Sequence, residues 1–70
     1  PPSYPSTLYS MIDLYPLLAD GWELIKSSSS AGYFLLLPPL KDSRRGKTTN
    51  WSEITFQDKI VKVPDYAPGL

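Results

Sequence analysis

Residues 21–37, with the sequence GWELIKSSSSAGYFLLL, decide the fold that this chain is expected to adopt. Residues 22–26 suit a β-strand in which Trp22 and Leu24 share one face. The four serines that follow predict a turn or a flexible loop. Residues 33–37 are apolar at every position, which is typical of a central strand covered on both faces. Two strands joined by a serine turn are therefore expected.

A helical pattern precedes these strands, in residues 7–20. Its apolar residues follow the i, i+3, i+4, i+7 spacing of a helix, and they are Leu8, Met11, Ile12, Tyr15 and Leu18. Pro16 conflicts with a continuous helix, because proline removes an amide donor and clashes with the preceding turn at a cost of about 3 kcal/mol. Either the helix is kinked, or Asp13 caps a second, short helix with Pro16 in its first turn. Gly21 suits the left-handed position after the helix end.

The second half of the chain predicts two more strands. Residues 51–56 alternate as a half-buried strand does, although Asn50 and Glu53 together also resemble a helix-start signal. Residues 57–59 form a turn, and residues 60–63 form a short last strand. The expected fold class is α+β, with one kinked or short helix packed on a three- to four-stranded antiparallel β meander.

The length and composition predict a single small domain. We expect an extended or disordered Pro-rich arm at residues 1–6, the α+β domain at 7–63 and an irregular tail at 64–70. A domain of this size buries about 60% of its unfolded surface, so its stability margin is small. The 70 residues include no Cys and no His, which excludes disulfides and zinc sites of the usual kind. Association with a partner or with itself is the remaining source of support.

One tetrad carries a family resemblance. Gly21-Trp22-Glu23-Leu24 after a helix, followed by the aromatic and apolar strand 33–38, resembles a family of small bacterial and phage domains of unknown function that carry a GWEL signature. The resemblance covers residues 11–38. Those domains have a strand before the helix, which the Pro-rich start here lacks, and the strands after residue 38 fall outside the match. The resemblance implies a fold and no activity, so no functional residue is carried over.

No arrangement of residues suited to catalysis is visible. The acidic residues are scattered, and the serine run lacks the context of an activated nucleophile. Gly46-Lys47-Thr48 lacks the first glycine of a phosphate-binding loop, and a strand rather than a helix is expected after it. We therefore expect a non-catalytic protein without cofactor or metal. With no apolar run of membrane-spanning length and no secretory leader, a cytoplasmic location is expected.

The loop at residues 41–49 is the best candidate for a binding site. It contains the bases Lys41, Arg44, Arg45 and Lys47. Arginine matches phosphate oxygens with two parallel hydrogen bonds, and lysine adds a point charge. Trp51 lies just beyond the loop and Tyr33 on the neighbouring strand, where each could stack on a nucleotide base. The pattern predicts a site for single-stranded nucleic acid or another anion; the alternative is a solvated loop with Trp51 in the core.

Other aromatic residues suggest a protein partner. Tyr4, Tyr9, Met11 and Tyr15 would form an exposed stripe, and tyrosine is enriched at protein interfaces. Trp22 is interpreted as the core anchor beneath the helix. Seven basic and seven acidic residues give a net charge of zero, whereas nucleic-acid-binding domains are usually basic. The expected function is a non-catalytic protein-interaction module, such as a phage or bacterial accessory subunit that self-associates or joins an assembly. The alternative is a single-stranded nucleic-acid-binding protein.

Overall fold

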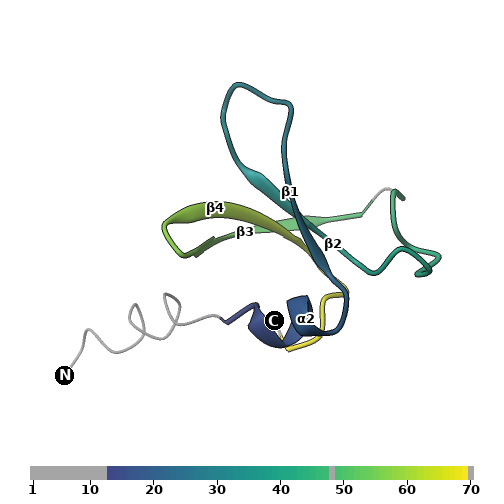
Figure 1. Cartoon of the computed structure of the whole chain (residues 1–70). Coiled ribbons are helices and arrows are strands. Elements are labelled where there is room, and N and C mark those ends of the chain that lie inside the picture. The colour runs from purple at the N-terminus through teal and green to yellow at the C-terminus, as the bar shows by residue number, and fades with distance from the viewer. Residues whose placement is uncertain (1–12, 48, 70) are drawn as a thin grey trace.

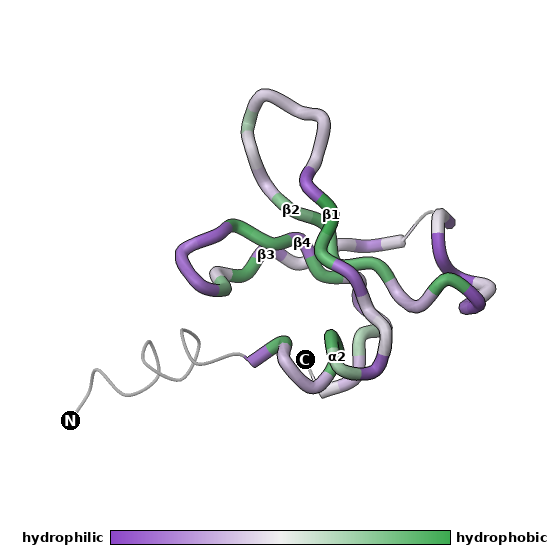
Figure 2. Tube along the Cα trace, viewed as in Figure 1, coloured by the Kyte–Doolittle hydropathy of each residue, from purple (hydrophilic) through white to green (hydrophobic). Residues whose placement is uncertain are grey.

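The computed structural model describes residues 13–47 and 49–69, which form one short helix and one sheet (Figure 1). The elements are α2 (Tyr15–Ala19), β1 (Glu23–Lys26), β2 (Phe34–Leu37), β3 (Trp51–Phe56) and β4 (Lys59–Pro64). The strand order is β1-β2-β4-β3. Apolar segments lie along much of β1, β2 and β4, whereas much of β3 and most of the turns are polar (Figure 2). The chain is thus a small α+β fold, as the sequence predicts.

The prediction of an antiparallel meander was wrong, because the sheet is mixed. β4 lies between β2 and β3 and runs parallel to β2, with Phe34 opposite Val61. The β1–β2 and β3–β4 pairs are antiparallel, as expected. β4 contributes the buried Val61 and Val63, whereas four of the six residues of β3 are exposed. The more apolar strand gains more from a central position, and the polar side chains of β3 meet water at the edge.

The start of α2 agrees with the short-helix alternative in the place of Pro16, but Leu14 rather than Asp13 is the N-cap residue and it makes no side-chain cap bond. Oδ1 of Asp13 accepts a hydrogen bond of 2.8 Å from the backbone N–H of Tyr15. Pro16 lies in the first turn, where an amide has no helical partner to lose. Residues 7–12, which also carry the helical pattern, lie outside the described residues.

The end of α2 is a Schellman motif that directs the chain into β1. Gly21 has φ +102° and donates its N–H to the carbonyl of Leu18 at 3.2 Å. The N–H of Trp22 donates to the carbonyl of Leu17 at 3.0 Å. This pair of bonds satisfies two carbonyls at the helix end and normally accompanies an apolar contact between the same residues. Leu17 and Trp22 are accordingly both buried in the core.

The core lies between the sheet and α2. Its buried apolar residues are Leu14, Leu17, Trp22, Leu36, Phe56, Val61, Val63 and Ala67. Trp22 is 7% exposed, which confirms its interpretation as a core anchor. Its ring packs on that of Tyr66, with the centroids 6.2 Å apart. The C-terminal segment, predicted to be an irregular tail, is therefore part of the core and lies beside α2 (Figure 1).

The position of β2 is central, as predicted, but the expectation that both of its faces are covered was wrong. Leu36 is fully buried on the side of α2, whereas Leu35 and Leu37, which point to the opposite face, are only half-buried. A two-layer domain covers one face of its sheet, and apolar side chains on the second face stay accessible.

Candidate functional site

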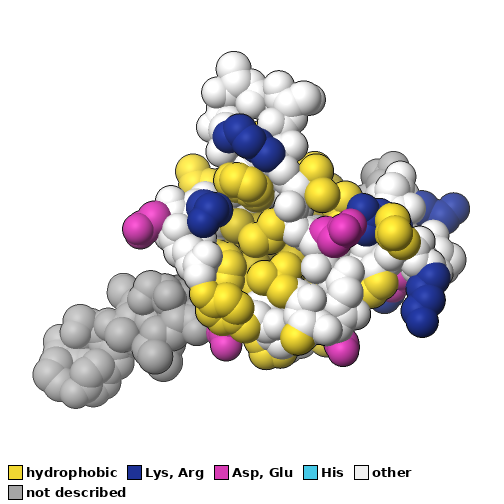
Figure 3. Space-filling view, viewed as in Figure 1, with side chains coloured by type: hydrophobic (Ala, Val, Ile, Leu, Met, Phe, Trp, Pro, Cys, Tyr) yellow, Lys and Arg dark blue, Asp and Glu magenta, His cyan; other side chains and the backbone are white. Residues whose placement is uncertain are grey.

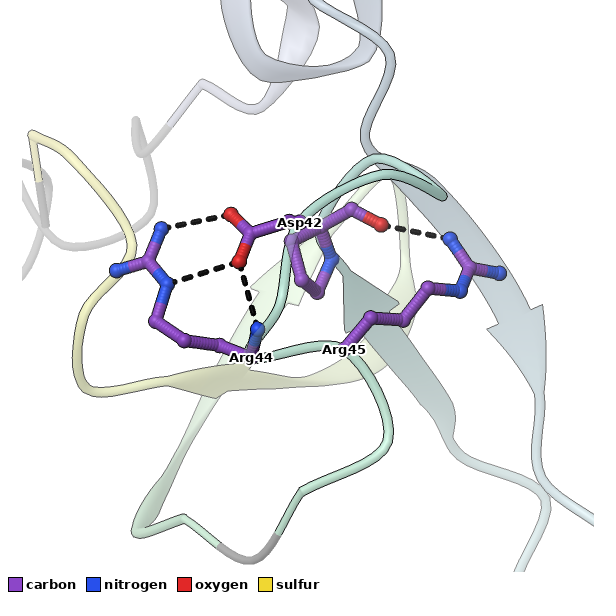
Figure 4. Close-up of polar contacts among 4 residues, drawn as sticks. Asp42, Arg44 and Arg45 are labelled. Carbon is purple, nitrogen blue, oxygen red and sulfur yellow. Dashed lines mark hydrogen bonds and ion pairs between the residues drawn. The ribbon is translucent and has the colours of Figure 1, made fainter.

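The basic loop between β2 and β3 is built from consecutive turns. It has to pass the end of β4, because β4 separates the two strands that the loop connects. The N–H of Asp42 donates to the carbonyl of Pro39 at 2.9 Å, and the N–H of Arg45 donates to the carbonyl of Asp42 at 3.1 Å. These bonds give the loop a defined shape, and its two arginines leave it in different directions (Figure 4).

Arg44 is held by Asp42. Its Nε donates to Oδ1 of Asp42 at 3.0 Å and its Nη2 donates to Oδ2 at 2.8 Å, while its backbone N–H also donates to Oδ1 (Figure 4). The guanidinium carbon lies 4.1 Å from the centroid of the Tyr66 ring. The hydrogen bonds from Arg44 lower the pKa of Asp42 to about 2, and those to Asp42 raise the pKa of Arg44. The two guanidinium donors of Arg44 that could bind a phosphate are already bonded to the carboxylate of Asp42.

Arg45 connects the loop to β1, the edge strand on the opposite side of the sheet from β3. Its Nη1 donates to the carbonyl of Pro38 at 2.6 Å, and its Nη2 donates to Oε1 of Glu23, the first residue of β1, at 2.7 Å. The Arg45 side chain is only 20% exposed. Arg45 therefore braces the loop against β1, while Arg44 braces it against the segment after β4.

The remaining predicted nucleic-acid ligands are separated. Lys41 and Lys47 are exposed in the loop, and Trp51, which opens β3, is 38% exposed beyond it. Tyr33 precedes β2 and so lies at the opposite end of that strand from the loop. Nζ of Lys62 lies 4.2 Å from the centroid of the Tyr33 ring. The structure thus brings Trp51 to the loop and keeps Tyr33 away from it.

Basic side chains are also dispersed over the surface. In the view of Figure 3 they lie at separate places around the periphery, with hydrophobic side chains gathered over the middle. Lys26 lies over the ring of Phe34, with its Nζ 5.3 Å from the centroid, and so belongs to the β1–β2 hairpin rather than to the loop. A continuous basic track, on which a single strand of nucleic acid is normally held, is not formed by these described residues.

The sheet face away from α2, which we call the open face, gathers apolar side chains, of which sequence reasoning assigned only Trp51 to a site. By strand alternation and register it carries Ile25, Leu35, Leu37, Trp51 and Ile60, together with the charged residues Glu23, Glu53 and Lys62. Three of its apolar residues have large exposed fractions: 40% for Ile25, 38% for Trp51 and 46% for Ile60. Among residues 13–47 and 49–69, no helix or strand covers this face. The signal in the sequence was Ile25, which alternation places opposite Trp22.

The predicted aromatic stripe is described only at Tyr15. That side chain is 55% exposed, its ring packs edge-on against Phe56 with centroids 5.3 Å apart, and its hydroxyl is hydrogen-bonded to the side-chain amide of Gln57. Tyr4, Tyr9 and Met11 lie outside the described residues. Tyr15 therefore helps attach the start of α2 to the β3–β4 hairpin.

The described residues also contain a hollow beside α2. It has a volume of about 410 Å³ and is lined by Asp13, Pro16, Leu17, Asp20, Pro68 and Gly69. No group of three or more potential metal-ligating side chains is present in the described part of the chain, so the two carboxylates do not make a metal site there. No helix among the described residues is long and apolar enough to cross a membrane.

Comparisons with known proteins do not add a family or a function. No protein-family model, no curated protein and no solved structure matches this chain. The resemblance to the GWEL domains stays a prediction.

Proposed function

We propose that this chain is a non-catalytic protein-interaction module, and that a protein partner packs on the open face of its sheet. The observation that carries the proposal is the exposure of Ile25, Trp51 and Ile60 on a face that no described helix or strand covers. Exposed large apolar side chains gathered on one uncovered face mark protein interaction sites. Removal of these side chains from water would favour binding by about 25 cal/mol per Å² of apolar area.

The charges on the open face suit a protein rather than a nucleic acid. Lys62 lies near the middle of the face, opposite Glu53 on β3 in the strand register, and Glu23 lies near the β1 end. The face therefore mixes both signs among its apolar residues, which suits a protein surface better than a polyanion. Nucleic-acid affinity needs basic side chains free to contact phosphates, and Arg44 and Arg45 each have an acidic partner within the chain.

The proposal is tested by affinity co-purification with three forms of the chain. The double variant Ile25→Gln/Ile60→Gln makes the open face polar without changing its charge. The matched control is Leu40→Gln, because Leu40 is 79% exposed but lies in the loop, away from the open face. We expect a partner protein to be retained by the wild type and by Leu40→Gln, and to be lost by the double variant.

A nuclease arm distinguishes the alternative function. If the retained material is nucleic acid, it disappears on nuclease treatment, and Arg44→Ala/Arg45→Ala weakens its binding and reduces its salt dependence. That result would replace the proposed protein partner by single-stranded nucleic acid. Equal retention of a protein partner by the wild type and by the open-face variant would also contradict the proposal.

A further inference from the structure

The exposed edge of β3 has a row of free backbone groups. Gln57 and Asp58 form a two-residue turn, so the flanking pair Phe56–Lys59 is a hydrogen-bonded pair. Alternation along β3 then directs the N–H and C=O groups of Glu53 and Thr55 away from β4. In the described part of the chain, neither residue makes a backbone hydrogen bond on that side.

This edge lacks the usual protection against pairing with another strand. β3 contains no proline and no lysine, and its register with β4 is continuous over six residue pairs, without a bulge. The other edge strand, β1, has only four residues and ends in Lys26. A long, regular and weakly charged edge is a template for strand addition, so β3 is the better site for it.

We propose that a second copy of this chain pairs with β3 through its own β3, in antiparallel orientation, with the twofold axis at Ile54. The inference goes beyond the proposed partner of the open face, because it concerns a different surface. In this register Glu53 exchanges its N–H and C=O bonds with Thr55 of the second copy, and the two Ile54 side chains meet. The two sheets then continue as one, with their open faces on the same side.

Charge selects this register over its neighbours. A twofold axis at Glu53 would place two carboxylates directly opposite each other, which destabilises a strand pair. An axis at Thr55 would shorten the overlap, because Gln57 has φ +51° and cannot extend the strand. With the axis at Ile54, five residues of β3 overlap and the one charged residue of β3, Glu53, faces a hydroxyl. The zero net charge of the chain adds no long-range repulsion between copies.

A second copy of the chain fits this edge because the outward N–H and C=O groups of one β3 pair with those of the other. Homo-oligomers are most often twofold dimers in which one patch meets its own copy. A domain of 70 residues without disulfides also gains stability from association. Since the contact is one pair of short strands, we expect a weak dimer that forms with rising concentration.

The test is sedimentation velocity of the complete chain from micromolar to millimolar concentration. We expect the mass to rise from 7.8 kDa towards twice that value. Thr55→Pro removes an outward N–H that β4 does not use, and we expect this variant to stay monomeric. Lys26→Pro is the matched control at the other edge: Ser27 donates its N–H to the carbonyl of Tyr33, so the N–H of Lys26 points outward too. This control should still dimerise.

Cysteine crosslinking tests the register independently, including the case in which Thr55→Pro fails to fold. The chain has no Cys, so Ile54→Cys introduces the only thiol. At a non-hydrogen-bonded antiparallel pair the two Cα atoms are about 4.5 Å apart, within disulfide reach. Oxidised Ile54→Cys should therefore form a covalent dimer much faster than Glu53→Cys, whose two copies would lie beyond the ~7 Å limit.

Three results would overturn the inference: a wild-type chain that stays monomeric at millimolar concentration, a dimer that Lys26→Pro abolishes and Thr55→Pro leaves intact, or crosslinking of Glu53→Cys as fast as of Ile54→Cys. None of them depends on the open-face partner, because the purified chain is measured alone. Conversely, loss of partner binding by Ile25→Gln/Ile60→Gln in a chain that still dimerises would leave the dimer standing.

Discussion

Arg44 and Arg45 are adjacent in the chain, but their side chains serve different parts of the molecule. Arg44 forms a two-pronged contact with Asp42 and lies over Tyr66. Arg45 reaches Glu23 and the carbonyl of Pro38. The planar guanidinium suits both tasks because its donors have a fixed geometry, which a lysine ammonium does not provide. At this scale Arg44 and Arg45 make structural contacts, whereas Lys41 and Lys47 stay exposed in the loop.

The pKa of Asp42 gives a direct test of the Arg44 contact. Hydrogen bonds from Arg44 lower that pKa from 3.8 to about 2, so the pair stabilises the folded chain above about pH 4, and this contribution is lost as the pH falls through about 2. We expect an NMR titration of the Asp42 carboxyl to have its midpoint near the lower value. In Arg44→Met the midpoint should move towards 3.8, whereas Arg45→Met should leave it unchanged. A wild-type midpoint at the ordinary value would contradict the contact.

Among the elements, the β3–β4 hairpin shows a local conflict between residue type and backbone. Gln57 and Asp58 have φ values of +51° and +64°. Two-residue hairpin turns favour Asn-Gly or Asp-Gly at these positions, because a side chain in the left-handed region costs about 1 to 2 kcal/mol. Gln57 has a compensating contact, since its side-chain amide bonds Tyr15. Asp58 has none among the described residues.

Asp58→Gly should therefore stabilise the chain. The free energy gained by relieving the backbone strain exceeds the entropic cost of the more flexible glycine in the unfolded chain. We therefore expect the free energy of unfolding to rise by about 0.5 to 1 kcal/mol. For a domain of this size that is a rise in Tm of roughly 2 to 8 °C. Thermal unfolding followed by circular dichroism measures it. Ser28→Gly is the control, because Ser28 is not in the left-handed region and should gain nothing. A lower Tm for Asp58→Gly would show that the strain is not stored there.

At the scale of the whole molecule, residues 13–47 and 49–69 cover one face of the sheet and leave the other uncovered. The core connects α2, the sheet and the C-terminal segment through a small number of large side chains, above all Trp22. A domain of this length has a total stability of only about 3 to 10 kcal/mol. Removal of one such side chain is therefore comparable with the whole stability of the fold, whereas removal of a side chain from the open face is not.

The two tryptophans test this asymmetry. Trp22 is 7% exposed and Trp51 is 38% exposed. Trp22→Ala should lower the free energy of unfolding by about 3 to 5 kcal/mol and leave much of the chain unfolded at room temperature. Trp51→Ala should cost about 1 kcal/mol or less, because its site is already in contact with water. Urea denaturation at low protein concentration measures both. Equal losses would contradict a one-sided core.

The sequence alone determined the local features of this chain. Alternation, turn residues and breakers located the four strands and the glycine after the helix, and they placed the β3–β4 turn to within one residue, since Lys59 already belongs to β4. These features depend on neighbours in the chain. The sequence left open a kinked helix or a short second helix with Pro16 in its first turn; the described residues contain the short helix Tyr15–Ala19, and residues 7–12 lie outside them. The absence of Cys and His likewise follows from composition and excludes disulfides and zinc sites with Cys or His ligands.

Only the tertiary structure decided how the strands associate and which side chains are free. The order β1-β2-β4-β3 depends on which of β3 and β4 is more deeply buried, and a short stretch of sequence does not contain that comparison. Arg45 meets Glu23 across 22 positions of sequence, so the loop could not be recognised as internally paired from its own residues. In the part of the chain that the structure describes, α2 and the C-terminal segment cover one side of the sheet, and the open face is the other side. Contacts between distant residues set these features: they give Arg45 an acidic partner on β1 and place Ile25, Trp51 and Ile60 on one exposed face of the sheet.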